Sequence, residues 1–418
     1  MLNHKRTLIA ALVSVSLMGC GESTTQTETK PQLTAQDAKQ FLTQAQNDIA
    51  KMQVPAAHAE WSYATNINFD TAAVSAYFNE VLSTKVAKLA KEAAKFNDVD
   101  VDADTRRQLD LLKNSLTMPP PADAEKAERL AKIGSDLSAM YGSGEYCSED
   151  GTCKSLVEMS SEMATLRDAD KLLEYWTGWR EVSKPMAGLY AEQVSLANEG
   201  AGELGFENVS ALWRGKYDMP ADEFPKELDR LWTQVEPFYE SLHCHVRARL
   251  GEHYGEDVVP QDKPIPAHLL GNMWAQSWGN IYDIVKPQQE MKVPDVTGAL
   301  VEQGYDEVAM VKQAESFFSS LGFEELPDTF WERSMFQKPE GRDVQCHASA
   351  WDLDDKDDLR IKMCIQKTGE EFNVIHHELG HNYYQRAYKD QPLLYRGSAN
   401  DGFHEAIGDF IALSITPE

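Results

Sequence analysis

The chain has 418 residues and a formal net charge of −27, from 67 acidic side chains against 40 lysines and arginines. This length accommodates a large core or roughly two to three average domains. The acidic balance excludes nucleic acid as a partner, because phosphate binding requires a basic face, and it predicts solubility.

Residues 1–19 have the pattern of a bacterial export signal. The pair Lys5-Arg6 precedes a short apolar run that ends in Leu17-Met18-Gly19-Cys20. This ending resembles a lipobox, in which the signal is cut before the cysteine and lipids are attached to it. We therefore predict a lipoprotein signal peptide, lipidation of Cys20 and a polar tether over residues 20–32. The alternative is an ordinary signal peptide with an incidental cysteine.

The rest of the chain contains no stretch of the ~20 apolar residues that a transmembrane helix needs. The mature protein is therefore expected to be exported. It would be held to a bacterial membrane by its N-terminal lipid alone, and would face the periplasm or the exterior.

Residues 33–418 have the pattern of a mainly α fold. Apolar residues recur at helical spacing in Thr34–Met52, whose first residue suits an N-cap, and again in Thr71–Phe96. Ala122–Tyr141 and Ser155–Asn198 are long, rich in helix formers and almost free of breakers. The proline-rich joints between these segments are too short for flexible linkers, so one large helical domain is predicted.

Export also permits disulfides, and two are predicted, Cys147–Cys153 and Cys346–Cys364. The first pair flanks a short polar loop. The second lies symmetrically about Asp355, the centre of an acidic turn, which predicts a β-hairpin within Val344–Ile365. Cys244 is left over, and we expect a buried free thiol there.

The chemistry starts from the segment His377-Glu378-Leu379-Gly380-His381, which has the form H-E-x-x-H. On a helix, residues i and i+4 share a face, so both imidazoles can reach one metal ion. A helix with two surface histidines is the alternative for this motif alone. The extended form of the motif is excluded, because Tyr384 and Ala387 stand where it needs glycine and histidine. His376 lies about 100° away from the ligand face and is expected to be a bystander.

A second helical pattern, Gly402–Asp409, supplies the third ligand. Glu405 would complete a two-His, one-Glu site with a fourth position open for water, as in catalytic zinc sites. Asp409, one turn further on, can accept the spare N–H of a ligand histidine. His404 is expected to start the helix without a catalytic part.

Zinc in such a site lowers the pKa of bound water to ~7 and polarises the scissile carbonyl. Glu378 is predicted to be the catalytic base, which takes the proton of that water and passes it to the leaving amine.

Several segments together resemble signatures of the angiotensin-converting enzyme family, the peptidyl-dipeptidases A. They occur in the family's order, with weaker likeness in Tyr175–Arg180 and Leu212–Tyr217: Gly271–Trp278, Asn280–Asp283, Cys346–Asp352 and Gly402–Asp409. The resemblance implies a mostly helical zinc peptidase with a deep channel. Such an enzyme removes dipeptides from oligopeptides with a free C-terminus, often with chloride activation.

The resemblance also implies roles for single residues. His347 would hydrogen-bond the substrate backbone, and Ala348 and Ser349 would lie on the strand that pairs with the peptide. Gln276 would help to hold the terminal carboxylate of the substrate, and Arg180 would contact chloride.

Family domains continue well beyond the third ligand, whereas this sequence ends at Glu418. We therefore expect a peptidase domain that is incomplete at its C-terminus, as a fragment or a natural truncation, with exposed apolar faces and low stability. An aminopeptidase or endopeptidase with the same ligands is the near alternative to a dipeptidyl carboxypeptidase. The other alternative is a lipoprotein that binds zinc and peptide with weak or no catalysis.

Overall fold

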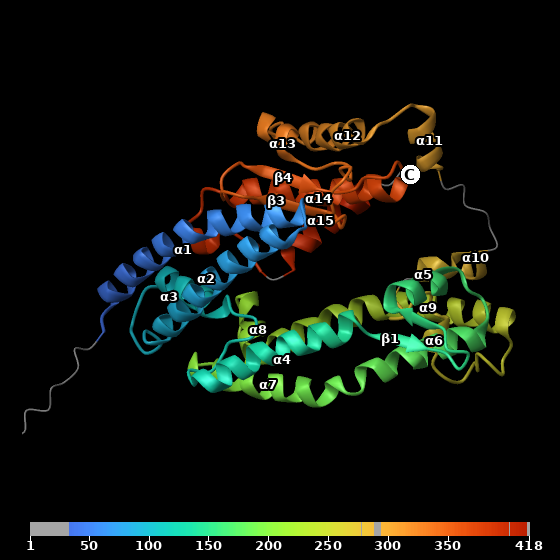
Figure 1. The fold of residues 1–418 in the computed structure, drawn as a ribbon, viewed down its shortest axis with the longest axis horizontal. Coiled ribbons are helices and arrows are strands. Elements are labelled where there is room, and N and C mark those ends of the chain that lie inside the picture. Colours follow the sequence, from blue (N-terminus) through green and yellow to red (C-terminus); the bar gives the residue numbers. More distant parts are fainter. Residues whose placement is uncertain (1–32, 277, 288–293, 401, 416–418) are drawn as a thin grey trace, which may run out of the picture.

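The computed structural model describes residues 33–276, 278–287, 294–400 and 402–415. The signal peptide, Cys20 and the tether lie outside the described residues, so they stay predictions. Figure 1 shows two groups of helices: the two ends of the described chain build one, and its middle builds the other. Within the described part of the chain, no helix is both long and apolar enough to cross a membrane.

The predicted mainly α fold is confirmed, and the only strands in the described residues form two small hairpins. The N-terminal helices are α1 (Ala35–Ala64), α2 (Phe69–Ala94) and α3 (Ala103–Asn114). The middle of the chain forms α4 (Ala124–Gly142), β1 (Glu145–Cys147), β2 (Cys153–Ser155), α5 (Leu156–Thr165), α6 (Ala169–Ser183), α7 (Met186–Glu203), α8 (Val209–Arg214), α9 (Phe224–Tyr254) and α10 (Tyr282–Val285). The C-terminal part forms α11 (Val296–Glu302), α12 (Glu307–Ser320), α13 (Asp328–Arg333), β3 (Ser349–Asp352), β4 (Leu359–Lys362), α14 (Gly369–Tyr388) and α15 (Phe403–Ser414). Short 3₁₀ turns are η1 (Gly215–Tyr217), η2 (Ala267–Leu269), η3 (Trp278–Ile281) and η4 (Leu393–Tyr395).

The start of α1 agrees with the sequence. The Thr34 side chain accepts the backbone N–H of Asp37, and the Asp37 carboxylate accepts the backbone N–H of Thr34 at 2.9 Å. This capping box satisfies two amide groups that the first helical turn leaves free. The helix continues past the predicted end at Met52 and includes Pro55.

The long helix predicted over Ser155–Asn198 is wrong, because the structure divides this segment into α5, α6 and α7. Ser155 caps α5, and Asp168 caps α6 by accepting the N–H of Lys171 at 2.9 Å. Pro185 precedes α7. Side-chain caps and a proline therefore interrupt a composition that suits helix throughout.

The predicted hairpin is present as β3 and β4, which pair antiparallel from Ser349–Lys362 to Asp352–Leu359. Asp355 in the connecting turn has a left-handed backbone, with φ of 56°. Both predicted disulfides are formed. Cys346–Cys364 lies beyond the ladder, and it is one position out of the register that would place Cys346 opposite Ile365.

The second hairpin, β1–β2, was not predicted. Its strands have three residues each, too few to show an alternating pattern. Cys147 and Cys153 are directly opposite each other in its register, so the disulfide joins paired strand residues.

The N-terminal helices contact strand β3 and the segment that leads into it. Ile67 forms an isolated bridge with Asp343, and the Gln345 N–H donates to the carbonyl of Ala64 at 2.9 Å. The rings of Trp61 and Trp351 meet edge to face with centroids 5.5 Å apart. These contacts fix the segment that leads into β3 against the end of α1.

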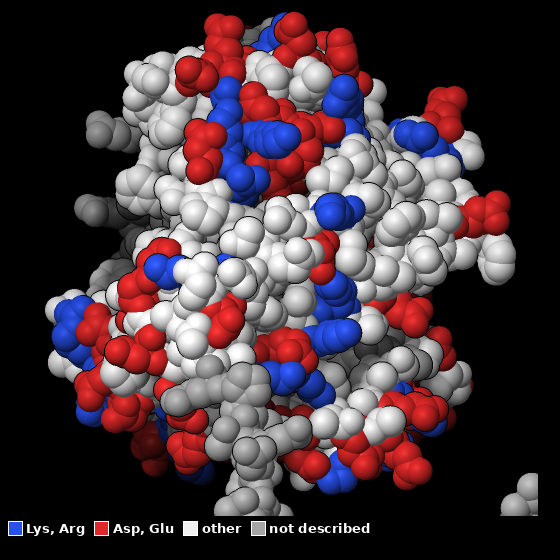
Figure 2. Space-filling model, turned by 90° about the vertical axis from the view of Figure 1, so that its left-hand side faces the viewer, with Lys and Arg blue, Asp and Glu red and all other residues white. Residues whose placement is uncertain are grey.

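Each of the two groups of helices has its own apolar cluster. One cluster surrounds α14 with residues from α11 to α13, β4 and α15, and another joins α5, α6, α9 and α10. A smaller cluster packs Ala90 of α2 against Ala197 of α7 and Leu212 of α8, and so connects the groups. On the side drawn in Figure 2, basic side chains lie among acidic ones.

Helix α9 carries a row of exposed apolar side chains: Leu228, Leu231, Trp232, Val235, Phe238, Tyr239 and Leu242. Cys244 lies on the same helix and is exposed, so the prediction of a buried thiol is wrong. Its burial depended on which helix face the fold covers, and helical periodicity alone does not fix that.

Asp352 in the acidic turn gives a pH-dependent expectation. Burial, and then the charge of Asp354, raise the pKa of Asp352 from 3.8 to about 7. The folded state therefore binds this proton more tightly than the unfolded state does, and the resulting stability is lost as pH rises through 7. At pH 8 the partly buried Asp352 carboxyl group is charged, which destabilises the folded state, and asparagine removes this charge. Asp352→Asn should therefore raise the melting temperature by about 1–3 °C at pH 8. Solvent screening limits the gain in the free energy of unfolding to ~1 kcal/mol. Thermal melts at pH 8 and pH 4 check this: a lower melting temperature for the variant at pH 8 would contradict it.

Candidate metal centre

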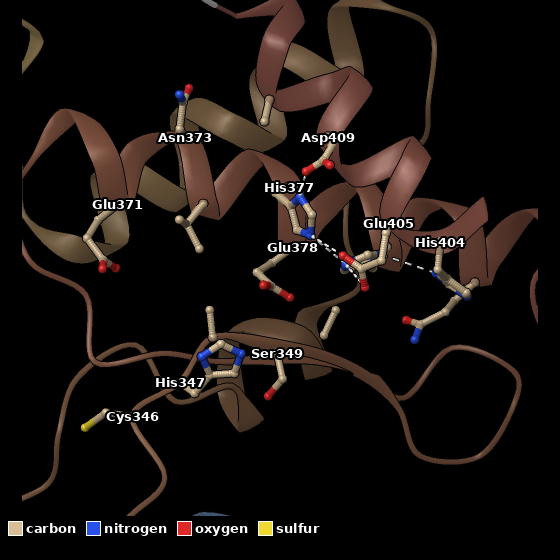
Figure 3. Close-up of a pocket in the computed structure, with 16 residues that line it drawn as sticks. Cys346, His347, Ser349, Glu371, Asn373, His377, Glu378, His404, Glu405 and Asp409 are labelled. Atoms are coloured by element: carbon tan, nitrogen blue, oxygen red, sulfur yellow. Dashed lines mark hydrogen bonds and ion pairs between the residues drawn. The ribbon is translucent and has the colours of Figure 1, made fainter. Parts of the chain in front are cut away.

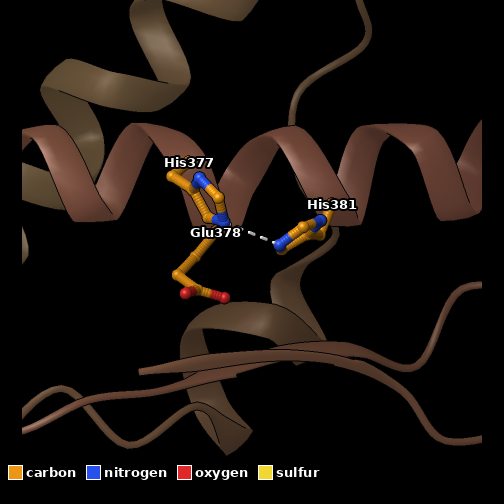
Figure 4. Close-up of side chains that lie close together, drawn as sticks. All are labelled: His377, Glu378 and His381. Atoms are coloured by element: carbon orange, nitrogen blue, oxygen red, sulfur yellow. Dashed lines mark hydrogen bonds between the residues drawn. The ribbon is translucent and has the colours of Figure 1, made fainter. Parts of the chain in front are cut away.

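Helix α14 presents the H-E-x-x-H segment to a cavity. The helix begins after Thr368, whose hydroxyl accepts the backbone N–H of Glu371 at 3.2 Å. Ile375 and Leu379 are buried in the apolar core on one side of α14. His377 and His381 lie on the opposite side, one turn apart, and their rings turn toward each other (Figure 4).

Helix α15 brings the predicted third ligand to the same point. Gly402, whose backbone is left-handed with φ of 87°, directly precedes the helix, and Glu405 lies in its first turn. The Nε2 atoms of His377 and His381 are 2.9 Å apart. Carboxylate oxygens of Glu405 lie 3.3 Å from Nε2 of His377 and 3.8 Å from Nε2 of His381.

These separations fit a zinc ion. Tetrahedral zinc with bonds of about 2.0–2.1 Å to nitrogen and oxygen places its ligand atoms about 3.3–3.4 Å apart. The three separations in the structure, 2.9, 3.3 and 3.8 Å, bracket that value. Two imidazole nitrogens and one carboxylate are also the donor set of catalytic zinc, which leaves a fourth position for water or substrate.

Glu378 points from α14 into the same space (Figures 3 and 4). Its side chain is largely buried. Burial, and next the negative charge of Glu405, raise the pKa of Glu378 to about 7, against the opposing positive charge of Lys362. A carboxyl group with this pKa can both accept and return a proton near neutral pH.

Asp409 lies beside the first histidine. Its Oδ1 is 3.1 Å from Nδ1 of His377. A hydrogen bond between these atoms would keep the proton on Nδ1 and leave the Nε2 lone pair free for a metal ion. Asp409 therefore lies where the sequence predicts a partner for a ligand histidine.

Two glycines allow α14 and α15 to approach closely. A Cβ on Gly380 would lie 3.2 Å from Cα of Gly408, and a Cβ on Gly408 would lie 2.8–2.9 Å from three atoms of the His377 ring. Carbon atoms in contact normally stay about 3.5–4.0 Å apart, so His377 would have to move.

Gly408→Ala should therefore weaken zinc binding by about 5- to 150-fold, the range for 1–3 kcal/mol of overpacking. Competition with a chelator measures the affinity. Gly188→Ala in α7 is the matched control, because a Cβ there meets nothing within 4 Å. Equal affinity in Gly408→Ala and Gly188→Ala would show that the close approach does not hold His377.

The cavity beside these residues has a volume of about 830 Å³. Its other wall is the segment that enters β3, with His347, Ala348 and Ser349 among its lining residues (Figure 3). β4 pairs with one edge of β3, so in the described residues the other edge of β3 has no partner strand.

Gln276 and Arg180 are not among the described residues that line this cavity. Gln276 is exposed, and its backbone N–H donates to Asn272. The Arg180 guanidinium stacks on Trp176 at 3.9 Å and donates to the carbonyl of Met273, and burial lowers its pKa. Their roles toward the substrate carboxylate and chloride stay predictions.

Two further histidines lie beside the ligands. His376 is buried, and its Nδ1 contacts the carbonyl of Phe372 at 2.7 Å, so it faces the core as expected of a bystander. His404 lines the cavity and contacts His381, a position that the sequence did not indicate. Its place directly before Glu405 was the only available signal.

Comparison with known proteins agrees with this geometry. The family model described as angiotensin-converting enzyme matches residues 32–418. The chain belongs to the angiotensin-converting enzyme family. The family match includes both groups of helices and every segment on which the resemblance was based.

Relatives in the angiotensin-converting enzyme family come from distant animals. The angiotensin-converting enzyme of the leech Theromyzon tessulatum is 38% identical over 398 residues, which cover 92% of this chain and 63% of that protein. The protein of that name from Bos taurus is 39% identical over 364 residues, 86% of this chain and 28% of the bovine one. The one from the fly Haematobia irritans exigua is 34% identical over 386 residues, 91% of this chain and 62% of the fly protein. The chain thus spans less than two thirds of the length of these relatives.

Proposed function

We propose that this protein is a zinc-dependent peptidyl-dipeptidase, which releases C-terminal dipeptides from oligopeptides. One observation carries the proposal: two imidazole nitrogens and a carboxylate lie 2.9–3.8 Å from one another at the wall of a peptide-sized cavity. His377, His381 and Glu405 would hold the zinc. Membership of the angiotensin-converting enzyme family supports the same reading.

Zinc bound there would polarise the scissile carbonyl and lower the pKa of water. Glu378 would take the proton from the attacking water and deliver it to the nitrogen of the leaving amine. Its burial supports this role, because a half-neutralised carboxyl near pH 7 suits both transfers. Lys362 would limit the rise in the pKa of Glu378, since its ammonium group is buried nearby.

The substrate backbone would lie along the free edge of β3. Ala348 and Ser349 offer backbone donors and acceptors at the cavity wall, as in other proteins that add a peptide strand to a sheet edge. The Lys362 ammonium donates to the carbonyls of Gln345 and His347 at 2.8 and 2.6 Å, which would keep this segment in place.

Tripeptides with one end blocked test the proposed specificity. The purified protein should release a dipeptide from an N-acylated tripeptide and should leave the C-terminal amide of the same tripeptide intact, with products identified by mass spectrometry. Cleavage that requires a free N-terminus would identify an aminopeptidase instead. Bound zinc without any product would favour the zinc- and peptide-binding lipoprotein.

We also propose that lipid on Cys20 holds the exported protein to its membrane. Cys20→Ser should move the protein from the membrane fraction to the soluble fraction without changing the rate of peptide hydrolysis. Immunoblots of separated fractions check this. A variant that stays with the membrane would rule out Cys20 as the anchor.

A further inference from the structure

His404 lines the cavity and has no role in the proposed chemistry. It lies at the start of α15, directly before Glu405, and it is only partly accessible to solvent. Its Nδ1 lies 3.3 Å from Nδ1 of His381, as the dashed line beside it in Figure 3 marks. Its Nε2 lies 2.9 Å from the hydroxyl oxygen of Tyr388.

The proton positions in this chain of contacts follow from the metal site. Nε2 of His381 faces His377 and Glu405, so it must be free of a proton to bind a cation. The proton of neutral His381 is then on Nδ1, from which it can be donated only to an acceptor. Nδ1 of His404 lies 3.3 Å away and accepts this proton when the proton of His404 is on Nε2, where it is donated to the oxygen of Tyr388.

Every contact in this arrangement has one donor and one acceptor. Burial raises the pKa of Tyr388, helped by the negative charges of Asp352 and Asp355, so its hydroxyl stays protonated. The Tyr384 ring packs at 4.8 Å from the His404 ring and limits its rotation.

We propose that His404, held by Tyr388, positions His381 as a metal ligand by fixing its tautomer and ring orientation. The inference rests on the proposed zinc site. In this arrangement each proposed ligand histidine has its own hydrogen-bond acceptor. The Asp409 carboxylate serves His377, and the His404 imidazole serves His381. His404 is a positioning residue, because it acts only through His381.

Zinc affinity of the metal-free protein, measured by competition with a chelator, tests the inference. His404→Phe keeps a ring and loses the acceptor, and should weaken zinc binding by about 10- to 100-fold. His404→Asn places an oxygen near the position of Nδ1 and should stay within about threefold of wild type. Tyr388→Phe should weaken binding by a smaller factor, and Tyr384→Phe, which keeps the ring against His404, should not change it.

Thermal melts of the metal-free variants show whether each one is folded. If His404→Phe does not fold, the comparison of His404→Asn, Tyr388→Phe and Tyr384→Phe still decides the question. The inference is overturned if His404→Phe binds zinc as tightly as wild type, or if Tyr388→Phe and Tyr384→Phe bind it equally well. A wild-type protein without zinc affinity would instead refute the proposed function.

Discussion

Replacing Glu378 by glutamine should lower kcat by at least about a thousandfold and leave zinc affinity within a few-fold of wild type. Glutamine keeps the size of the side chain and the carbonyl oxygen, but it cannot accept a proton from water. Glu378 is largely buried beside the ligand atoms, so no solvent-exposed base can substitute for it easily. Hydrolysis of an N-acylated tripeptide and metal analysis of the same sample measure the two quantities.

Glu370→Gln is the control for this change, because Glu370 is an exposed acid in the first turn of the same helix. It should retain wild-type turnover. Full activity in Glu378→Gln would rule out Glu378 as the base. A loss of zinc in this variant would instead make Glu378 a ligand.

Replacing Glu405 by alanine should weaken zinc binding by roughly 200- to 1,000-fold. Zinc bound by protein donors gains ~10–16 kcal/mol in total, so one donor accounts for about 3–4 kcal/mol. The structure offers Glu378 as a second candidate for the third ligand, because the possible ligand atoms of His377, Glu378 and His381 also lie within 4.8 Å of one another. We propose Glu405 as the third ligand, because its carboxylate oxygens lie 3.3 and 3.8 Å from the Nε2 atoms of His377 and His381.

Chelator competition on the metal-free proteins measures the effect of Glu405→Ala. Glu307→Ala is the matched control, because Glu307 is also an acid in the first turn of a helix, at α12. Zinc affinity that survives Glu405→Ala but not Glu378→Gln would exchange the two assignments.

Local sequence patterns were enough to predict several parts of the fold. The cap at Thr34 and the hairpin around Asp355 depend on contacts between residues close in the chain, and both are present. The spacing of His377 and His381 fixes their common face on any helix. The family resemblance is confirmed over residues 32–418.

Other features were not evident from composition. The break between α5 and α6 lies where the Asp168 side chain caps α6, and the break between α6 and α7 lies at Pro185. Cys244 is exposed because its face of α9 is not covered by the described residues. Composition specifies neither effect.

The same distinction holds for the candidate site. The H-E-x-x-H spacing predicted that His377, Glu378 and His381 lie close together, and they do. The close approach at Gly380 and Gly408 and the contact from His404 to His381 arise only when α14 and α15 pack together. Gln276 illustrates the opposite case, because its expected role came from resemblance alone, and it does not line the cavity among the described residues.

Anomalous diffraction at the zinc edge, from crystals of the wild-type protein, tests the central claim most directly. We predict one strong peak at about 2.0–2.2 Å from Nε2 of His377, Nε2 of His381 and a carboxylate oxygen of Glu405, with Glu378 outside bonding distance. A peak bonded to Glu378 in place of Glu405, or no peak at these residues in zinc-containing crystals, would contradict the proposed metal centre.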